Sequence, residues 1–494
     1  MNKAIYIATS EQNSGKSIIT LGLMSMLMGK MAKVGYFRPI IEDIEEGGFD
    51  NHIETVIGHF GMDIEFEDAY AITKSKLIKK KNKGKIGEVL DLIIEKYKKL
   101  EERFDFVLVE GTGFTGEGTV IELDMNVLIA KNLGIPTIIV GSGAGKTLEE
   151  LIDSLYLLYD SFKVKDVEVL AVIANKVQLQ NIELVTNSLK KSLPQNILVN
   201  SIPLIQNLNN PTVQEIVNEL DAKVLFGAAH LNNQTGSFSV GAMQLRNYLL
   251  HLKENSLVIT PGDRADIILG ALQANESLNY PTISGIVLTG NIVPEDSILK
   301  LIEGLSTIVP IIAVEEGTYF ITNKIGSIKS KIYANNKQKI KISIATFEKY
   351  VDLDNLAEKL ITFEAEGMTP KMFQYNLVKR AREHRKHIVL PEGNDERIIR
   401  AVSRLLEMDV VAISVIGNKK QIESKVLELG LFFDFSKVQI INPIESEHFD
   451  DYVNTYYELR KAKNVTIEMA KDLMEDVSYF GTMMVYKGHA DGMV

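Results

Sequence analysis

The chain contains no cysteine, and this absence excludes both disulfide bonds and thiolate chemistry. Proteins of reducing compartments lack disulfides, so a cytoplasmic location is expected. Long hydrophobic runs are also missing, since none reaches the roughly 18 residues that a membrane-spanning helix needs. The first residues, MNKAIYIATS, lack the basic leader, apolar stretch and cleavage site of a secretory signal. Neither secretion nor a membrane partner is expected.

An excess of positive charge is lacking as well. The formal net charge of -11 argues against a general nucleic-acid binder. One lysine-rich stretch, KSKLIKKKNKGK at 74–85, leaves two interpretations open: a polyanion partner, or a solvated helix end and loop. With 494 residues, of which 45% are hydrophobic and 24% charged, the chain is a globular protein of about three domains.

Apolar runs that alternate with helix-like stretches predict an α/β fold in three segments. In the first segment, 1–205, runs such as AIYIAT and FDFVLVEGTG end at Gly, Pro or polar residues, which predicts a parallel sheet covered on both faces. Ligands of such sheets bind at the carboxyl ends of the strands. A second segment, 215–345, repeats the alternation on a smaller scale. Residues 346–369 are expected to be a linker.

The third segment, 370–494, begins a second doubly wound sheet. Thr369 can cap a helix that has Pro370 in its first turn and Phe373 and Leu377 on one face. Strands are expected at HIVLP, VVAISVIG and VQIINP, with helices between them. The last residues, HADGMV, are typical of the opening of one more strand, so the sheet is expected to be unfinished.

The motif with the most chemical content lies near the start of the chain. In ATSEQNSGKS, at 8–17, Gly15, Lys16 and Ser17 follow a strand and open a helix, as in a phosphate-binding loop. Ser10 stands where the usual pattern has its first glycine. Backbone N–H groups of such a turn attract phosphate. Lys16 is therefore predicted to reach the terminal phosphates of a nucleotide, and the Ser17 hydroxyl to bind Mg²⁺.

Three residues at other strand ends extend this prediction. Glu110 ends the run FVLVE, where its carboxylate can hold the metal directly or through water, and Asp50 is a possible second acid. Asn175, in IANKV, can bind a base through its amide. For each acid, a helix cap or a surface carboxylate is the alternative. A second GKT, within 140–151, is interpreted as a strand-to-helix turn that opens a helix at Thr147, not as a second nucleotide loop.

These residues, with the segments VEG and ANKV, resemble the dethiobiotin synthetase branch of P-loop proteins over the first segment. The order of all three segments is similar to the long bacterial phosphate acetyltransferases. ITPGDRADI is similar to the turn of the DRTGG module, which usually accompanies regulatory units, and LPEGNDERIIRA and YYELRKAKN are the most specific parts. The resemblance implies a P-loop regulatory domain (1–205), a DRTGG-type domain (215–345) and the first part of a phosphate acetyl/butyryltransferase domain (370–494).

The implied reaction is reversible transfer of an acetyl group between coenzyme A and inorganic phosphate, in acetate metabolism. In that family the acetyl group passes directly from the thioester sulfur to a phosphate oxygen, with no metal or covalent enzyme intermediate. Arg460 and Arg397 match arginines that the family uses near the CoA substrate, where a planar guanidinium pairs with phosphate at two points. The alternative for each is a helix-surface arginine paired with an acid such as Glu396 or Glu458.

Chains of this family continue past the position of Val494 with the serine, aspartate and arginines of the catalytic cleft. The catalytic residues are therefore expected beyond Val494, and little turnover is expected from this chain alone. ATP or another nucleotide with Mg²⁺ is the expected effector of the P-loop, and a homo-oligomer is expected. Two alternatives are a nucleotide-sensing regulator without acyltransferase activity and an ATP-dependent carboxylase of the dethiobiotin kind, which leaves the later segments without a role.

Overall fold

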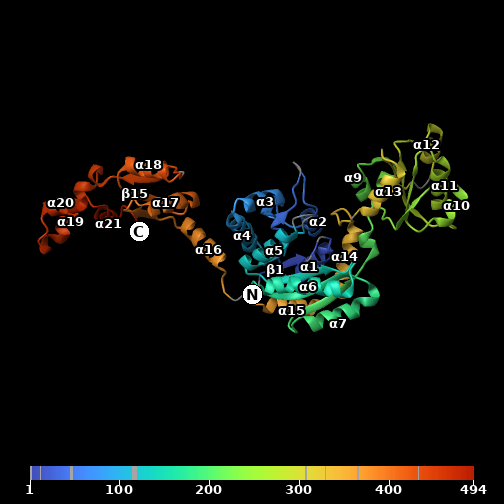
Figure 1. Cartoon of the computed structure of the whole chain (residues 1–494), viewed down its shortest axis with the longest axis horizontal. Coiled ribbons are helices and arrows are strands. Elements are labelled where there is room, and N and C mark those ends of the chain that lie inside the picture. The colour runs from blue at the N-terminus through green and yellow to red at the C-terminus, as the bar shows by residue number, and fades with distance from the viewer. Residues whose placement is uncertain are drawn as a thin grey trace. The chain divides into compact units, whose positions relative to one another are not determined.

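Figure 1 shows a computed structural model of the chain, and the structure describes residues 3–9, 11, 13–44, 48–113, 119–305, 309–328, 330–363, 367–431 and 433–494. The chain divides into two compact units, Met1–Thr369 and Pro370–Val494. Parallel sheets flanked by helices occur in both, so the predicted α/β class is confirmed. Ser10 of the predicted phosphate loop lies outside the described residues.

The first sheet has six parallel strands in the order β2-β5-β1-β6-β7-β8. Its strands are β1 (Ala4–Thr9), β2 (Val34–Phe37), β5 (Phe106–Glu110), β6 (Thr137–Ser142), β7 (Val169–Val177) and β8 (Leu198–Pro203). All residues of the first four are buried, because helices cover both faces of the sheet. Strands β3 (Ile40–Ile41) and β4 (Ile72–Thr73) form a separate two-stranded parallel sheet.

Helices connect these strands, and two helices from later in the chain also pack on this part of the protein. They are α1 (Lys16–Lys30), α2 (Asn51–Phe60), α3 (Lys74–Asn82), α4 (Ile86–Arg103), α5 (Thr119–Leu133), α6 (Leu148–Lys163), α7 (Ile182–Ser192), α8 (Gln206–Asn209), α14 (Lys337–Tyr350) and α15 (Leu353–Thr362). The lysine-rich stretch expected at a helix end forms α3 and the turn after it.

Helix α1 is apolar on nearly every side because a second helix covers it. Gly22 of α1 faces Phe347 of α14, and a Cβ at Gly22 would lie 2.1 Å from Cγ of that ring. Glycine therefore permits the close approach of the two helices. Helix α15 contacts β7 and buries Leu356 and Leu360. The expected linker, 346–369, thus contains the end of α14 and all of α15, since apolar residues at helical spacing bring the chain back to the first sheet.

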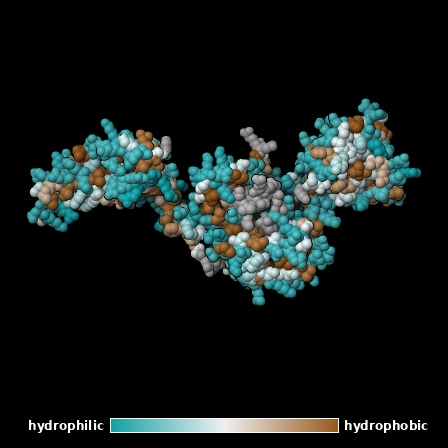
Figure 2. Space-filling model, in the orientation of Figure 1, coloured by the Kyte–Doolittle hydropathy of each residue, from teal (hydrophilic) through white to brown (hydrophobic). Residues whose placement is uncertain are grey.

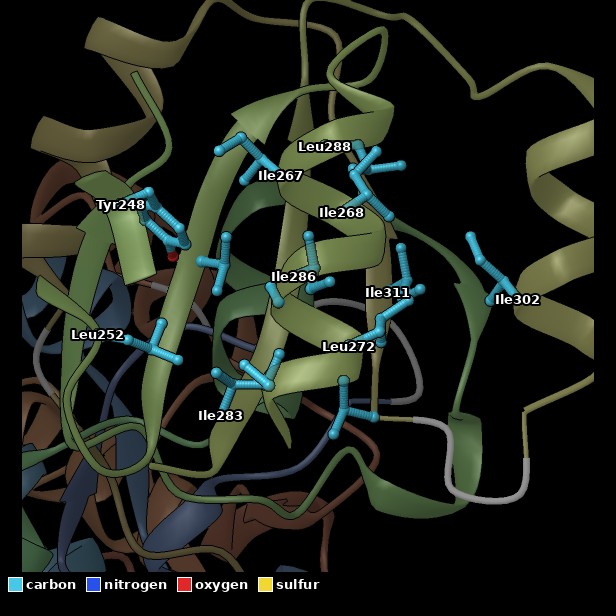
Figure 3. Packing of buried hydrophobic residues seen from close by; sticks show 14 residues of the cluster. Tyr248, Leu252, Ile267, Ile268, Leu272, Ile283, Ile286, Leu288, Ile302 and Ile311 are labelled. Carbon is cyan, nitrogen blue, oxygen red and sulfur yellow. The ribbon is translucent and has the colours of Figure 1, made fainter. Parts of the chain in front are cut away.

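The second sheet has the order β10-β11-β12-β13-β9, with β9 antiparallel at one edge. Its strands are β9 (Lys223–Phe226), β10 (Ser237–Val240), β11 (Ser256–Pro261), β12 (Ile283–Thr289) and β13 (Ile311–Ala313), and its helices are α9 (Val213–Leu220), α10 (Leu245–Tyr248), α11 (Ala265–Glu276), α12 (Asp296–Glu303) and α13 (Thr318–Ser327). Figure 3 shows Ile268 and Leu272 of α11 packed over Ile286 and Leu288 of β12 and Ile311 of β13.

The second unit has a parallel sheet in the order β16-β15-β14-β17. Its elements are α16 (Pro370–Glu383), β14 (His387–Leu390), α17 (Glu396–Met408), β15 (Ala412–Ile416), α18 (Lys419–Glu428), β16 (Val438–Ile441), α19 (Phe449–Arg460), α20 (Ile467–Met474), α21 (Val477–Tyr486) and β17 (Gly492–Met493). Strand β17 is the strand expected near HADGMV. Phe373 and Leu377 on α16 are 54% and 52% exposed, so the predicted apolar face of this helix is not buried within the unit.

The surface carries mostly hydrophilic residues. Figure 2 shows hydrophobic residues scattered among them on the visible face, as is ordinary for globular proteins. In the part of the chain that the structure describes, no helix is long and apolar enough to cross a membrane.

Candidate functional site

The GKS turn begins α1 at the carboxyl end of β1, as predicted. Gly15 has φ 81°, in the left-handed region that favours glycine, and no side chain caps this helix end. A Cβ at Gly15 would also lie 2.1 Å from Nδ2 of Asn175. The amide groups of the first turn of α1 are consequently available to an anion at this edge of the sheet.

Asn175 has a structural role at the phosphate loop. Its side chain is fully buried, and its Nδ2 donates to the carbonyl of Ser14 at 2.8 Å and to that of Gly15 at 3.4 Å. Its Oδ1 accepts from the backbone N–H of Lys176 at 2.9 Å. The amide therefore holds the backbone of the phosphate loop against the end of β7, and its contact with a base stays a prediction.

Lys16 points into the protein. Its side chain is 8% exposed, and Nζ donates to the carbonyl of Gly111 and lies 3.7 Å from Oε1 of Glu110. The sequence did not predict this ion pair between the loop lysine and the strand-end carboxylate. The lysine makes this contact where it was expected to face nucleotide phosphates.

Glu110 is the centre of a buried charged cluster at the carboxyl end of β5. It has no exposed surface. Its Oε2 accepts from the hydroxyls of Thr20, at 2.7 Å, and Tyr36, at 2.9 Å. Its Oε1 lies 3.1 Å from Nδ1 of His52 and 3.8 Å from Nε of Arg38. Four different elements or loops therefore surround the carboxylate with polar groups, but Oε1 makes no hydrogen bond with any described residue.

These neighbours determine the ionisation of the cluster. Burial alone would raise the pKa of Glu110, but His52, Lys16 and Arg38 together hold it well below its ordinary value. Burial, and then the negative charge of Glu110, raise the pKa of Tyr36 well above its ordinary value. Glu110 is consequently an anion that the surrounding cations stabilise, and Tyr36 is a neutral donor.

Asp50 caps α2 and pairs with Arg38. Its Oδ1 accepts from the backbone N–H groups of His52 and Ile53, at 3.0 and 3.1 Å. Nη1 of Arg38 lies 2.6 and 2.8 Å from its two oxygens. Asp50 therefore has the helix-cap role that was its alternative, and its oxygens already have cationic and N–H donors. Its role as a metal ligand stays a prediction.

The atoms around Glu110 determine whether the expected magnesium ion can bind there. Oxygen ligands suit Mg²⁺, but Oε1 of Glu110 is surrounded by three nitrogen groups, so Glu110 does not fit as a direct ligand in this arrangement. Ser17, Glu110 and His52 border a cavity of only about 10 Å³, which holds about one water molecule and no phosphate group. Among the described residues, no three His, Asp or Glu side chains surround a common metal position.

Four members of this cluster were not predicted from the sequence: Thr20, Tyr36, Arg38 and His52. Tyr36 and Arg38 belong to VGYFRP, in which an arginine directly after a buried apolar run indicates a charge at a sheet edge. His52 lies two residues after Asp50, in the stretch GGFDNHI. The second GKT is a helix start as predicted, since Thr147 and Glu150 form a capping box at α6.

The two arginines of the second unit differ in their partners. Arg397 begins α17 and forms two contacts with Asp395, from Nε to Oδ1 at 3.1 Å and from Nη2 to Oδ2 at 3.0 Å. Arg397 thus has an acidic partner, as in its alternative, and that partner is Asp395. Its contact with CoA stays a prediction. Arg460 ends α19 and is exposed. Its guanidinium has no hydrogen bond or ion pair with any described residue.

Three family models match consecutive parts of the chain. An AAA domain matches residues 3–226, a DRTGG domain matches 215–328, and phosphate acetyl/butaryl transferase matches 372–494. A phosphate acetyltransferase of Nitratidesulfovibrio vulgaris is 39% identical over 499 residues, covering 100% of this chain and 71% of the relative. The chain belongs to the phosphate acetyltransferase family. The predicted resemblance and the predicted class, an acyltransferase, are thereby confirmed.

A second relative agrees with this membership. A phosphate acetyltransferase of Synechocystis sp. is 38% identical over 505 residues, again covering 100% of this chain and 71% of the relative. Among solved structures, the EutD phosphotransacetylase from Staphylococcus aureus is 38% identical over 24% of this chain and 36% of its own, with a TM-score of 0.22. This phosphate acetyltransferase chain thus corresponds to most, but not all, of the length of its long relatives.

Proposed function

We propose that this chain takes part in the reversible reaction of acetyl-CoA with inorganic phosphate to give CoA and acetyl phosphate. In the forward direction a phosphate oxygen bonds to the thioester carbonyl carbon, the carbon–sulfur bond breaks, and the CoA sulfur leaves as a thiolate that takes up a proton. Two observations carry the proposal. Residues 372–494 match the transferase family model, and the whole chain is 39% identical to a phosphate acetyltransferase.

Within this reaction, we assign Arg460 to the phosphate groups of CoA. Its position at the end of α19 and its lack of an acidic partner support the assignment, because an unpaired guanidinium can form two parallel hydrogen bonds with a phosphate. Arg397 is a second candidate, but it must give up its ion pair with Asp395 in order to bind a phosphate. The loss of that ion pair would offset part of the binding free energy.

Calorimetric measurement of CoA binding to this chain tests the assignment, because binding can be measured without catalytic turnover. Arg460→Ala is expected to weaken CoA binding at least tenfold, which corresponds to about 1.4 kcal/mol. The control is Arg400→Ala, because Arg400 is also exposed on a helix of this unit but pairs with Glu396. Equal CoA affinity in the wild type and Arg460→Ala would contradict the role of Arg460.

The first segment is proposed to bind ATP or another nucleotide as an effector of the transferase. Gly15, Lys16 and Ser17 would contact the phosphates, and the Ser17 hydroxyl would hold an accompanying Mg²⁺. The support is the amino end of α1, which no side chain caps, and the left-handed Gly15 that precedes it. Because Lys16 is paired with Glu110, nucleotide binding is coupled to the buried cluster, and this suits a sensor better than a permanent nucleotide site.

A further inference from the structure

A cavity of about 480 Å³ is lined mostly by residues of the second segment, together with Asn207 and Asn210 just before it. Its lining includes no residue of the P-loop and neither arginine. It is found at the amino ends of the parallel strands: Gly236 precedes β10, Asn255 precedes β11, and Ile283 and Ser284 begin β12. The GDRAD turn follows the opposite, carboxyl end of β11. The cavity is therefore distinct from the edge at which this segment carries its family signature.

Amide side chains dominate the lining. Eight of the residues that border the cavity are asparagine or glutamine: Asn207, Asn210, Asn232, Asn233, Gln234, Asn255, Asn275 and Gln338. Thr235, Thr282 and Ser284 add hydroxyl groups, and His230 is the sole titratable group among the described lining residues. That lining includes no Asp, Glu, Lys or Arg and no Phe or Tyr.

Several of these amides are fixed by one end only. Nδ2 of Asn210 donates to the carbonyl of Gly236 at 3.3 Å, and Nδ2 of Asn233 donates to that of Ser284 at 3.2 Å. Oδ1 of Asn275 accepts from a backbone N–H of β12 at 2.9 Å. The other polar atom of each amide has no partner among the described residues. The wall thus presents orientated acceptors, from Asn210 and Asn233, and a donor, from Asn275.

Two further groups of the wall are buried without a partner. Ser284 is 2% exposed, and its Oγ makes no hydrogen bond with any described residue; the same holds for Nε2 of Gln234. Buried polar groups are nearly always hydrogen-bonded, because leaving them unpaired destabilises the fold. Both atoms have almost no accessible surface, so the groups that a ligand in the cavity can reach are the more exposed amides and hydroxyls of the wall.

The lining also defines which ligand chemistry fits. Without a cation it cannot balance a phosphate or carboxylate, and without an aromatic ring it offers no stacking surface to a nucleobase. Neutral amides and hydroxyls pair with groups that both donate and accept. We propose that this cavity binds an uncharged, hydroxyl-rich molecule of sugar size, and that the second segment is a small-molecule binding domain of the enzyme. The volume lies in the usual range for small-ligand sites, about 300–1,000 Å³.

Calorimetric titration of the 494-residue chain with D-glucose, D-ribose and their phosphate esters, glucose 6-phosphate and ribose 5-phosphate, tests the proposal. At least one neutral sugar is expected to bind, and its phosphate ester is expected to bind at least tenfold more weakly. The proposal is overturned if neither sugar binds up to about 10 mM, or if an ester binds more tightly than its sugar.

Variants locate the binding. Asn232→Ala removes an exposed lining amide that makes no side-chain hydrogen bond in the described structure, so the fold should not change, and Asn233→Ala removes a fixed one. The double variant is expected to bind the sugar about tenfold more weakly than the wild type. The matched control, Asn323→Ala, changes an exposed asparagine of α13 outside the cavity. Unchanged sugar affinity in the double variant would place the binding elsewhere and refute the proposal.

Discussion

Nζ of Lys16 lies 3.7 Å from Oε1 of Glu110, so the lysine of the phosphate loop is directed into the protein. With 8% of its surface exposed, it is also held by the carbonyl of Gly111. A nucleotide phosphate would have to replace Glu110 as the partner of this ammonium group. Nucleotide binding would then leave His52 and Arg38 as the basic groups near the Glu110 carboxylate, beside the hydroxyls of Thr20 and Tyr36.

The first prediction concerns the loop lysine. Lys16→Met, which keeps the aliphatic length but removes the charge, is expected to weaken the binding of ATP with Mg²⁺ at least tenfold, since the lysine supplies the positive charge for the phosphates. Calorimetry measures this affinity. Lys146→Met is the control, because Lys146 belongs to the second GKT and pairs with Glu11. If the two variants bind ATP equally well, the first loop is not the nucleotide site.

The second prediction concerns the buried carboxylate. Glu110→Gln preserves the shape of the side chain but leaves Lys16, Arg38 and His52 around a neutral group. Removing one partner from a buried ion pair typically destabilises a fold by about 3–5 kcal/mol, so a clear fall in the urea midpoint of the first unit is expected. Glu88→Gln is the control, since Glu88 is exposed and pairs only with surface lysines. An unchanged midpoint for Glu110→Gln would refute this role.

The third prediction is the pH dependence of the same contribution. The folded chain holds the pKa of Glu110 well below the ordinary value of 4.5, because His52, Lys16 and Arg38 overcome the effect of burial. A depressed carboxylate pKa stabilises the folded state above the unfolded pKa, and this stabilisation is lost as the pH falls through the folded pKa. Thermal midpoints should therefore fall more steeply below pH 4.5 for the wild type than for Glu110→Gln. Parallel curves would contradict the link to Glu110.

Local patterns were sufficient to predict most of the strands, although not β3, β4, β8, β9 or β10, and also the GKS turn and the strand-end position of Glu110. Each of these depends on residues that are neighbours in the sequence. The role of Asn175 could not be predicted in the same way, because its partner Ser14 lies 161 residues earlier and an amide at a strand end suits a base as well as a backbone carbonyl. Asp50 was ambiguous for a similar reason, since only the fold brings Arg38 to it.

The structure of the expected linker, 346–369, could not be predicted for the same reason: the surface on which it packs is formed by residues far away in the sequence. Residues 337–363 have helical periodicity, but nothing in that stretch says which surface its apolar face will cover. The covering helix could have been inferred from α1, which is apolar on nearly all sides and so needs a second layer. Gly22 is the residue that records this layer, because its lack of a side chain makes room for Phe347.

The fourth prediction tests that layer. Gly22→Ala places a Cβ about where the Phe347 ring lies, 2.1 Å from Cγ, and the ring and α14 must shift; overpacking of this kind costs about 1–3 kcal/mol. Gly29→Ala is the matched control in the same helix, because nothing lies within 4 Å of its added Cβ and alanine favours a helix over glycine by about 1 kcal/mol. Urea unfolding should therefore move in opposite directions for the two variants. Adding Phe347→Leu to Gly22→Ala should recover part of the loss, since the smaller side chain vacates the space that the methyl group needs. A neutral Gly22→Ala would mean that α14 does not pack on α1 in solution.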